Sequence, residues 1–242
     1  MFAERMPPRA FYFGRTAAAL HGLPLPTRFA SETLLHVGVA SGQRRVDTLG
    51  VQAHHVDLAR SDVVELHGLR VTSVERTWCD LAAARLTLAE LVAAGDRAIW
   101  RRSPRTTLAA LQRNIDGYQG RRGSRLMRVA FGLLSDAADS PPESELRVAI
   151  IDAGFPPPAV NLPLETPGGE RYSPDLSWPE LKVAIEYEGD QHRLDREQWN
   201  HDIRRFAALQ DAGWWIYRAT AEDYRSTHRL ILWLAQRVPP PR

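Results

Sequence analysis

The sequence has very little of two residue types that decide which chemistry a protein can support. Its 242 residues include one cysteine, Cys79, and one lysine, Lys182, beside 30 arginines. A single cysteine excludes an internal disulfide and a cysteine-rich zinc site, so we expect the protein to work in a reducing cytoplasm. A mechanism that needs a lysine has one candidate side chain.

Long hydrophobic runs are lacking as well. The apolar stretches are far shorter than the roughly 20 residues of a membrane-spanning helix. The first residues, MFAERMPPRAFYFGR, lack the apolar core of a secretion signal. We therefore expect no membrane partner and a cytoplasmic location. The remaining composition, 44% hydrophobic and 25% charged, is ordinary for a globular protein of one or two domains.

The net charge of +2 conceals a separation of charge along the chain. Residues 97–128 hold nine arginines and one acid, a net +8, whereas residues 140–223 hold sixteen acids and eight bases, a net −8. This arrangement is typical of a phosphate-binding surface next to a cation site. The alternative is that the arginines only solvate helix faces.

Some arginines of the basic segment are candidate contacts to nucleic acid. The motif QGRRGSR brackets arginines with glycines at an expected helix start, where backbone N–H groups and guanidinium groups can bind phosphate. We expect neutralisation of this motif to flatten the salt dependence of binding. The candidates are Arg101, Arg102, Arg121, Arg122 and Arg125.

The clearest domain boundary lies in SDAADSPPES, residues 135–144. Ser140 can cap a helix, prolines suit the first turn of that helix, and acids there complement its dipole. We therefore predict a first domain over residues 1–138 and a second over residues 139–242.

Hydrophobic periodicity predicts an α/β fold class, or α+β for the whole chain. In the first domain we expect a small mixed sheet and several helices: strands at 33–39, 51–56 and 68–73, and helices at 14–22, 74–84, 87–102, 106–115 and 123–137. The second domain should have the order αβββαβ(α): a helix at 143–153, strands near 159–165, 170–177 and 181–188, a helix at 195–212, a strand at 214–219 and a helix from 221.

Strand alternation within KVAIEYE defines the candidate site. Glu186 and Glu188 project to one face, whereas Val183, Ile185 and Tyr187 project to the other, which we expect to be the core face.

Asp175 precedes the turn into this strand, so its carboxylate can approach the glutamate pair across the hairpin. Glu143 is a plausible fourth acid. Converging carboxylates repel one another unless a divalent cation neutralises them, which predicts Mg²⁺ or Mn²⁺ bound by Asp175, Glu186 and Glu188.

The stretches PPESELR, YSPDLSWPELKVAIEYEGDQH, DIRRFAALQDAGW and IYRAT occur in the order found in a known family. They resemble a bacterial domain related to the Vsr endonuclease, within the PD-(D/E)XK superfamily. The resemblance implies metal-ligand roles for Asp175 and Glu186 and an acidic role for Glu143. It matches Gly189 and His192 to the family's acid-Gly-x-x-His ending, which encloses Gln191. Asp202, Arg205 and Arg218 match residues further along the family's sequence, which we expect to support the site.

The chain departs from the superfamily pattern at Glu188, which stands where the superfamily carries a lysine. We expect His192 to orient or deprotonate the attacking water, because an unperturbed histidine titrates near neutrality. His192 is equally suited to a supporting hydrogen bond, Asp202 and Arg205 to a surface pair, and the acids to exposed strand ends paired with arginine.

Two motifs of the first domain, GRTAAALHGLPLP and GLRVTSVERTWCDLA, resemble the type IV abortive-infection antitoxin family (AbiEi). Ser73, Arg76 and Asp80 within the second motif are interpreted as a helix cap and an i,i+4 ion pair rather than as a catalytic group.

The sequence therefore predicts a metal-dependent nuclease that hydrolyses phosphodiester bonds, with DNA as the favoured substrate. The rival is a non-catalytic, antitoxin-like or regulatory module whose nuclease fold only binds. A protein partner or a homodimer remains open.

Overall fold

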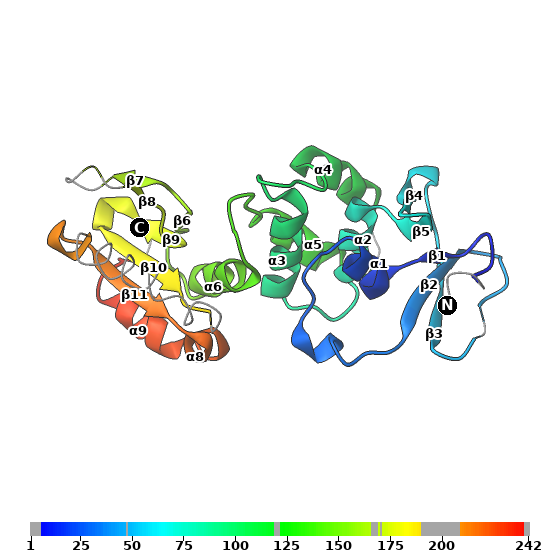
Figure 1. Ribbon diagram of the computed structural model, residues 1–242, viewed down its shortest axis with the longest axis horizontal. Coiled ribbons are helices and arrows are strands. Elements are labelled where there is room, and N and C mark those ends of the chain that lie inside the picture. Colours follow the sequence, from blue (N-terminus) through cyan, green and yellow to red (C-terminus); the bar gives the residue numbers. More distant parts are fainter. Residues whose placement is uncertain are drawn as a thin grey trace. The chain divides into compact units, whose positions relative to one another are not determined.

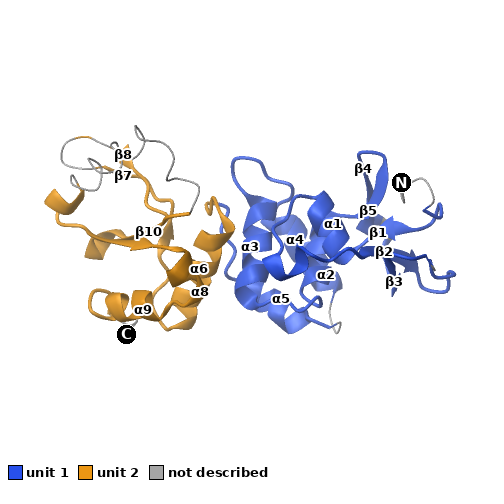
Figure 2. Ribbon diagram, turned by 60° about the horizontal axis from the view of Figure 1, so that its bottom comes forward, with its two compact units in different colours: residues 1–136 blue, residues 137–242 orange. Residues whose placement is uncertain are grey.

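The chain folds into two compact units, residues 1–136 and residues 137–242 (Figure 2). The structure is a computed structural model that describes residues 6–46, 48–118, 122–165, 169, 171–189 and 209–239. Both units combine helices with β-sheet, so the fold class is α/β (Figure 1). Among the described residues, no helix has the length and apolar character needed to cross a membrane.

The first unit contains a mixed five-stranded sheet with the order β3-β2-β1-β5-β4. β1 pairs antiparallel with β2 and parallel with β5. The sequence predicted β2, β3 and β5 but missed β1 and β4, because strands of two and four residues are too short to show alternation. The bounds are β1 (Phe11–Tyr12), β2 (Leu35–Ala40), β3 (Val51–Val56), β4 (Val63–Leu66) and β5 (Leu69–Thr72).

Helices make up the rest of the first unit and pack on one another. Trp78 lies fully buried among them and donates its indole N–H to the carbonyl of Leu91 at 2.9 Å. The predicted helices are all present, and the last one ends at Phe131 rather than at residue 137. Their bounds are α1 (Gly14–Leu20), α2 (Val74–Leu81), α3 (Leu88–Ile99), α4 (Leu108–Gly117) and α5 (Ser124–Phe131).

The second unit is built on a four-stranded sheet with the order β11-β10-β9-β6. β6, β9 and β10 pair antiparallel, and β11 pairs parallel with β10, as expected for a meander followed by a crossover. The bounds are α6 (Pro141–Asp152), β6 (Ala159–Val160), β7 (Leu164–Glu165), β8 (Arg171–Tyr172), β9 (Leu176–Trp178), β10 (Val183–Tyr187), β11 (Trp215–Ala219), α8 (Ala221–Arg225) and α9 (His228–Ala235).

Two predicted strands of the second unit are each divided in two. The strand expected at 159–165 breaks at Asn161, whose φ of 44° lies in the left-handed region, and the remainder, β7, pairs with β8 in a separate two-stranded sheet. The strand expected at 170–177 breaks before Pro174, which has no N–H for a ladder. The helix expected at 195–212 lies largely outside the described residues.

The core of the second unit confirms the predicted face of KVAIEYE. Val183 and Ile185 are 1% exposed and belong to a buried cluster that includes Ile150 of α6 and Leu230 of α9. Tyr187 packs against this cluster from its edge. The apolar face of β10 is thus committed to the core, which leaves the alternate face of the strand for Glu186.

Candidate functional site

Glu143 is fixed by the beginning of α6. Ser140 is the N-cap residue, and its hydroxyl accepts the backbone N–H of Glu143 at 3.4 Å. The Glu143 carboxylate in turn accepts the backbone N–H of Asp139 at 2.9 Å and the side-chain amide of Asn161 at 3.0 Å. The residue is only 6% exposed. The capping chemistry predicted for this helix therefore also holds a buried carboxylate in place.

Asp175 approaches the end of β10 across the hairpin, as the sequence predicted. Its Oδ2 accepts the backbone N–H of Tyr187 at 2.7 Å, between the two glutamates of the strand. Its own carbonyl accepts the N–H of Asn161 at 3.0 Å. Asn161 therefore contacts both Glu143, through its side chain, and Asp175, through its backbone.

Glu186 is held by a tyrosine that the sequence did not single out. The hydroxyl of Tyr172, on β8, donates to Oε1 of Glu186. Tyr172 is 3% exposed, so its ring anchors the hydrogen bond inside the unit. No local pattern indicated this contact, because Tyr172 and Glu186 are 14 positions apart and lie in different sheets.

The electrostatics show that these three acids form one cluster. The pKa of Asp175 is raised from 3.8 to about 8, mainly by burial and in addition by the negative charges of Glu143 and Glu186. Burial is also the main cause that raises the pKa of Glu143. A bound cation would relieve the repulsion among the three carboxylates, because opposite charge stabilises their ionised forms.

Glu188 has a different environment from that predicted for a metal ligand. Its Oε1 accepts a hydrogen bond from Nε of Arg218, on the neighbouring strand, and forms an ion pair with Nη2 of the same guanidinium group. Its backbone N–H donates to the carbonyl of Ala219 at 2.7 Å. The side chains of Glu188 and Arg218 are 38% and 50% exposed. The structure thus places Glu188 beside a positive charge.

The donor set suits a hard divalent cation, since carboxylate oxygens are the ligands that Mg²⁺ and Mn²⁺ prefer. Within the described ranges, however, no group of three His, Cys, Asp or Glu side chains has the geometry to hold a metal ion. Four of the predicted site residues, Gln191, His192, Asp202 and Arg205, lie outside the residues that the structure describes. The described part of the site offers Asp175 and Glu186 as the candidate ligands, with Glu143 beside them.

The arginines predicted to bind nucleic acid occupy two places in the first unit. Arg101 and Arg102 follow the end of α3, and Arg122 and Arg125 lie at the start of α5. All four are exposed, whereas Arg121 falls outside the described residues. Gly123 caps α5 with a φ of 86°, so the predicted helix start is present at the last glycine of the motif.

An aromatic ring lies next to the first pair of arginines. The guanidinium groups of Arg97 and Arg102 lie 4.4 Å and 5.8 Å from the centroid of the Trp100 ring, which is partly exposed. Arginine next to an indole ring is a common arrangement at nucleic-acid surfaces, where the ring can stack on bases. This neighbourhood is compatible with the predicted binding segment.

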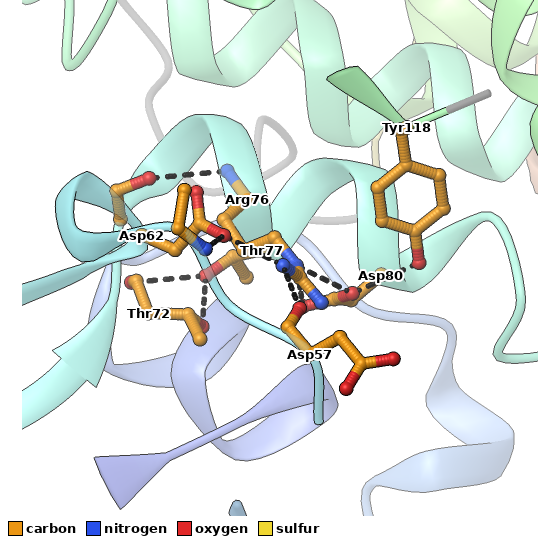
Figure 3. A network of polar contacts seen from close by, with 9 residues as sticks. Asp57, Asp62, Thr72, Arg76, Thr77, Asp80 and Tyr118 are labelled. Carbon is orange, nitrogen blue, oxygen red and sulfur yellow. Dashed lines mark hydrogen bonds and ion pairs between the residues drawn. The ribbon is translucent and has the colours of Figure 1, made fainter. Parts of the chain in front are cut away.

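A buried polar network in the first unit confirms the structural interpretation of Arg76 and Asp80 (Figure 3). The Ser73 hydroxyl caps α2 by accepting the N–H of Arg76 at 3.2 Å. Arg76 is 4% exposed and contacts Asp80 at 3.0 Å and Asp62 at 2.7 Å. The hydroxyl of Tyr118 donates to Asp80, also at 3.0 Å. The predicted helix cap and i,i+4 ion pair are therefore both present, and Asp62 is a second partner of Arg76.

A cavity of about 430 Å³ opens beside this network, between the start of α2 and α4. Its lining includes Asp62, Glu75, Arg76 and Arg113. Two acids and two bases give the lining a mixed charge, so charge does not indicate a class of ligand.

Two mycobacterial proteins are similar to this chain over most of its length. They are "Uncharacterized protein MT2308" of Mycobacterium tuberculosis strain CDC 1551 / Oshkosh and "Uncharacterized protein Rv2248" of strain ATCC 25618 / H37Rv. Each is 31% identical over 211 residues, which cover 87% of this chain and 74% of the relative. The chain belongs to the family of these two proteins.

A match of 211 residues is longer than either unit, so the family relationship extends over residues of both. No family model matches the chain, and no solved structure matches it. The comparisons therefore show which family the chain belongs to. The reaction or binding that the protein supports has to be argued from the geometry of its site.

Proposed function

We propose that the protein is a Mg²⁺- or Mn²⁺-dependent nuclease that hydrolyses phosphodiester bonds, with DNA as the favoured substrate. The observation that supports this most is the cluster of Glu143, Asp175 and Glu186. These acids come from three separate segments. Burial, together with the negative charges of Glu143 and Glu186, raises the pKa of Asp175 to about 8. Strongly shifted pKa values are concentrated at functional sites, and a bound cation would offset the repulsion among these carboxylates.

Each residue of the cluster has a distinct part in this proposal. Asp175 and Glu186 would hold the cation, which supplies charge stabilisation and an activated water for attack on phosphorus. Tyr172 orients Glu186 through its hydroxyl, and Asn161 orients Glu143 through its amide. His192 is proposed, from the sequence, to orient or deprotonate the water.

Binding of the nucleic acid falls to the first unit in this proposal. Residues 1–136 contain 19 basic and 12 acidic residues, a net charge of +7, whereas residues 137–242 contain 12 basic and 17 acidic residues, a net charge of −5. Polyanions are attracted to the former and repelled by the latter. The exposed arginines near α3 and α5 are the proposed phosphate contacts. The resemblance to the Vsr-like and antitoxin-like families agrees with this assignment of roles.

A second candidate function is a binding module with a non-catalytic acidic site. Two observations favour it: the described residues include no group of three side chains placed to hold a metal, and the charge of Glu188 is balanced by Arg218. In that case the second unit binds DNA or a protein partner, as in an antitoxin-like or regulatory protein.

Cleavage assays distinguish the two functions. Pure protein is incubated with single-stranded, duplex and nicked DNA and with RNA, in Mg²⁺, Mn²⁺ or EDTA. We expect cleavage only with a cation, and a loss of about a hundredfold or more in Asp175→Asn and Glu186→Gln, because each variant removes a ligand charge. Glu180→Gln, which removes an exposed acid of the same unit, should cut like the wild type.

Two outcomes contradict the nuclease. A wild-type protein that binds nucleic acid equally well in EDTA and never cuts it is the binding module. Variants that cut as well as the wild type show that the activity belongs to a contaminating nuclease.

A further inference from the structure

Arg218 lies at the edge of the acidic cluster. β10 and β11 pair in parallel, and their register places Arg218 directly beside Glu186. Arg218 then contacts Glu188, two residues further along β10, through both Nε and Nη2. A full positive charge is therefore held at the strand edge where the acids gather.

The contact with Arg218 changes what Glu188 can contribute. A carboxylate oxygen that already accepts a guanidinium N–H and forms an ion pair with that group offers a cation less charge and one lone-pair site fewer. Asp175 accepts the backbone N–H of Tyr187, and Glu186 accepts the hydroxyl of Tyr172. Glu188 pairs with a cationic side chain, that of Arg218.

The guanidinium group of Arg218 is a large and accessible donor. It carries five N–H donors in a planar fork. Half of the Arg218 side chain is exposed. A planar fork with an exposed edge is the geometry that binds phosphate oxygens in pairs. Lys182, the one lysine, is engaged elsewhere: its Nζ donates to the carbonyl of Ala212 at 2.9 Å.

We propose that Glu188 is a positioning residue for Arg218 and not a metal ligand, and that Arg218 binds a phosphate group of the nucleic acid next to the acidic cluster. This inference rests on the proposed nuclease function. In this proposal the Arg218–Glu188 ion pair has two effects. The guanidinium group offsets the repulsion between the phosphate and the carboxylates, and Glu188 holds the guanidinium group next to the acidic cluster.

Two independent measurements on the full chain test the inference. Mn²⁺ affinity is measured by calorimetry without nucleic acid, and affinity for a duplex oligonucleotide is measured in EDTA over a range of salt concentrations. The variants are Glu188→Gln, Arg218→Gln, Arg218→Lys and Asp175→Asn, with Arg229→Gln as the control. Arg229 is an exposed arginine of the same unit, with a side chain 70% exposed. Circular dichroism confirms that each variant is folded.

We expect Glu188→Gln to keep Mn²⁺ affinity within about twofold of the wild type, whereas Asp175→Asn loses about tenfold or more. Arg218→Gln should weaken DNA binding about tenfold and reduce the slope of log affinity against log salt by about one. Glu188→Gln should weaken DNA binding less than Arg218→Gln does, since it misplaces the guanidinium without removing it. Arg218→Lys should have the salt slope of the wild type, because it keeps the positive charge. It should keep only part of the DNA affinity, because lysine lacks the planar donor fork of arginine.

Loss of Mn²⁺ affinity in Glu188→Gln as large as in Asp175→Asn overturns the inference, since Glu188 is then a ligand. DNA affinity and salt slope unchanged in Arg218→Gln overturn it as well. A different result overturns the nuclease function: Mn²⁺ affinity that is absent in the wild type or unaffected by Asp175→Asn. The DNA titration, run in EDTA, still decides the role of Arg218 in that case.

Discussion

Uncharged polar residues determine where the acids of the second unit lie. Tyr172 holds Glu186, and Asn161 holds Glu143 while its backbone holds Asp175. Alternation along β10 selected Glu186 from the sequence, and the position before the hairpin selected Asp175, whereas Glu143 was proposed from the first helix of the domain. Their partners were not selected, because Tyr172 and Asn161 are 14 and 18 positions away from the acids they contact. A contact between distant residues leaves no periodic trace in the sequence.

The raised pKa of Asp175 makes a prediction about stability. For an acid whose pKa is higher in the folded protein, the contribution to stability is complete below the unfolded pKa of 3.8 and is lost as the pH rises through about 8. In EDTA, the free energy of unfolding of Asp175→Asn should therefore rise relative to that of the wild type between about pH 4 and pH 8. At pH 9 we expect a gain of at least about 1.4 kcal/mol, the free energy of one pKa unit.

Thermal or urea unfolding of both proteins in EDTA, at pH 4, 6, 8 and 9, measures this gain. Glu180→Gln serves as the control for the loss of one negative charge in the same unit. Saturating Mg²⁺ should reduce the advantage of the asparagine variant, since the cation stabilises the aspartate. Equal free energies of unfolding for the variant and the wild type at pH 9 in EDTA would show that the ionised Asp175 does not destabilise the folded protein.

At the scale of elements, the sequence predicted the starts of helices better than the ends of strands. Ser73 and Ser140 cap α2 and α6 as expected, because an N-cap is a local interaction between a hydroxyl and an N–H three residues on. The strands expected at 159–165 and 170–177 are each divided, at Asn161 and before Pro174. A left-handed asparagine is stabilised here by tertiary hydrogen bonds, which strand propensity does not include.

Gly123 makes an element-scale prediction about the first unit. It begins α5 with a φ of 86°, and an added Cβ would lie 2.6 Å from the backbone carbonyl of Ala82, at the end of α2. Gly123→Ala should therefore cost about 2–4 kcal/mol, from backbone strain and from the displacement of α5 against α2.

Gly117→Ala is the matched control, since a Cβ at this α4 position meets nothing within 4 Å and its φ is not positive. It should leave stability within about 0.5 kcal/mol of the wild type or raise it. Urea unfolding of the first unit compares the two. A Gly123→Ala protein as stable as Gly117→Ala would mean that the two helices are not in close contact.

On the scale of the whole molecule, each of the two units has its own hydrophobic core and a net charge of its own sign. The buried cluster around Val37 and Val71 lies within residues 1–136, and the cluster around Ile150 and Ile185 lies within residues 137–242. The net charges of the units are +7 and −5. The composition of the sequence alone indicated this separation of charge. The residues that belong to each core could be assigned only once the pairing of the strands was known.

The division predicts that binding functions can be separated. A fragment of residues 1–136 should bind duplex DNA with an affinity that falls as salt is raised, because its excess of arginine releases counterions. A fragment of residues 137–242 should bind Mn²⁺ and bind DNA at least about tenfold more weakly than the first fragment. Titrations of both fragments at 50 and 200 mM salt measure this. Stronger DNA binding by the acidic fragment would contradict the assignment.

The amide of Asn161 has a consequence for where the second fragment can begin. It donates to the carbonyl of Ala137 at 2.9 Å as well as to Glu143, and the N–H of Asp139 donates to Glu143 too. The three residues before the helix cap are therefore part of the acidic site. A fragment that begins at Ser140, the N-cap residue of α6, keeps every acid of the cluster and loses the backbone that orients Glu143. A cleavage assay on that fragment would therefore not test the proposed nuclease function.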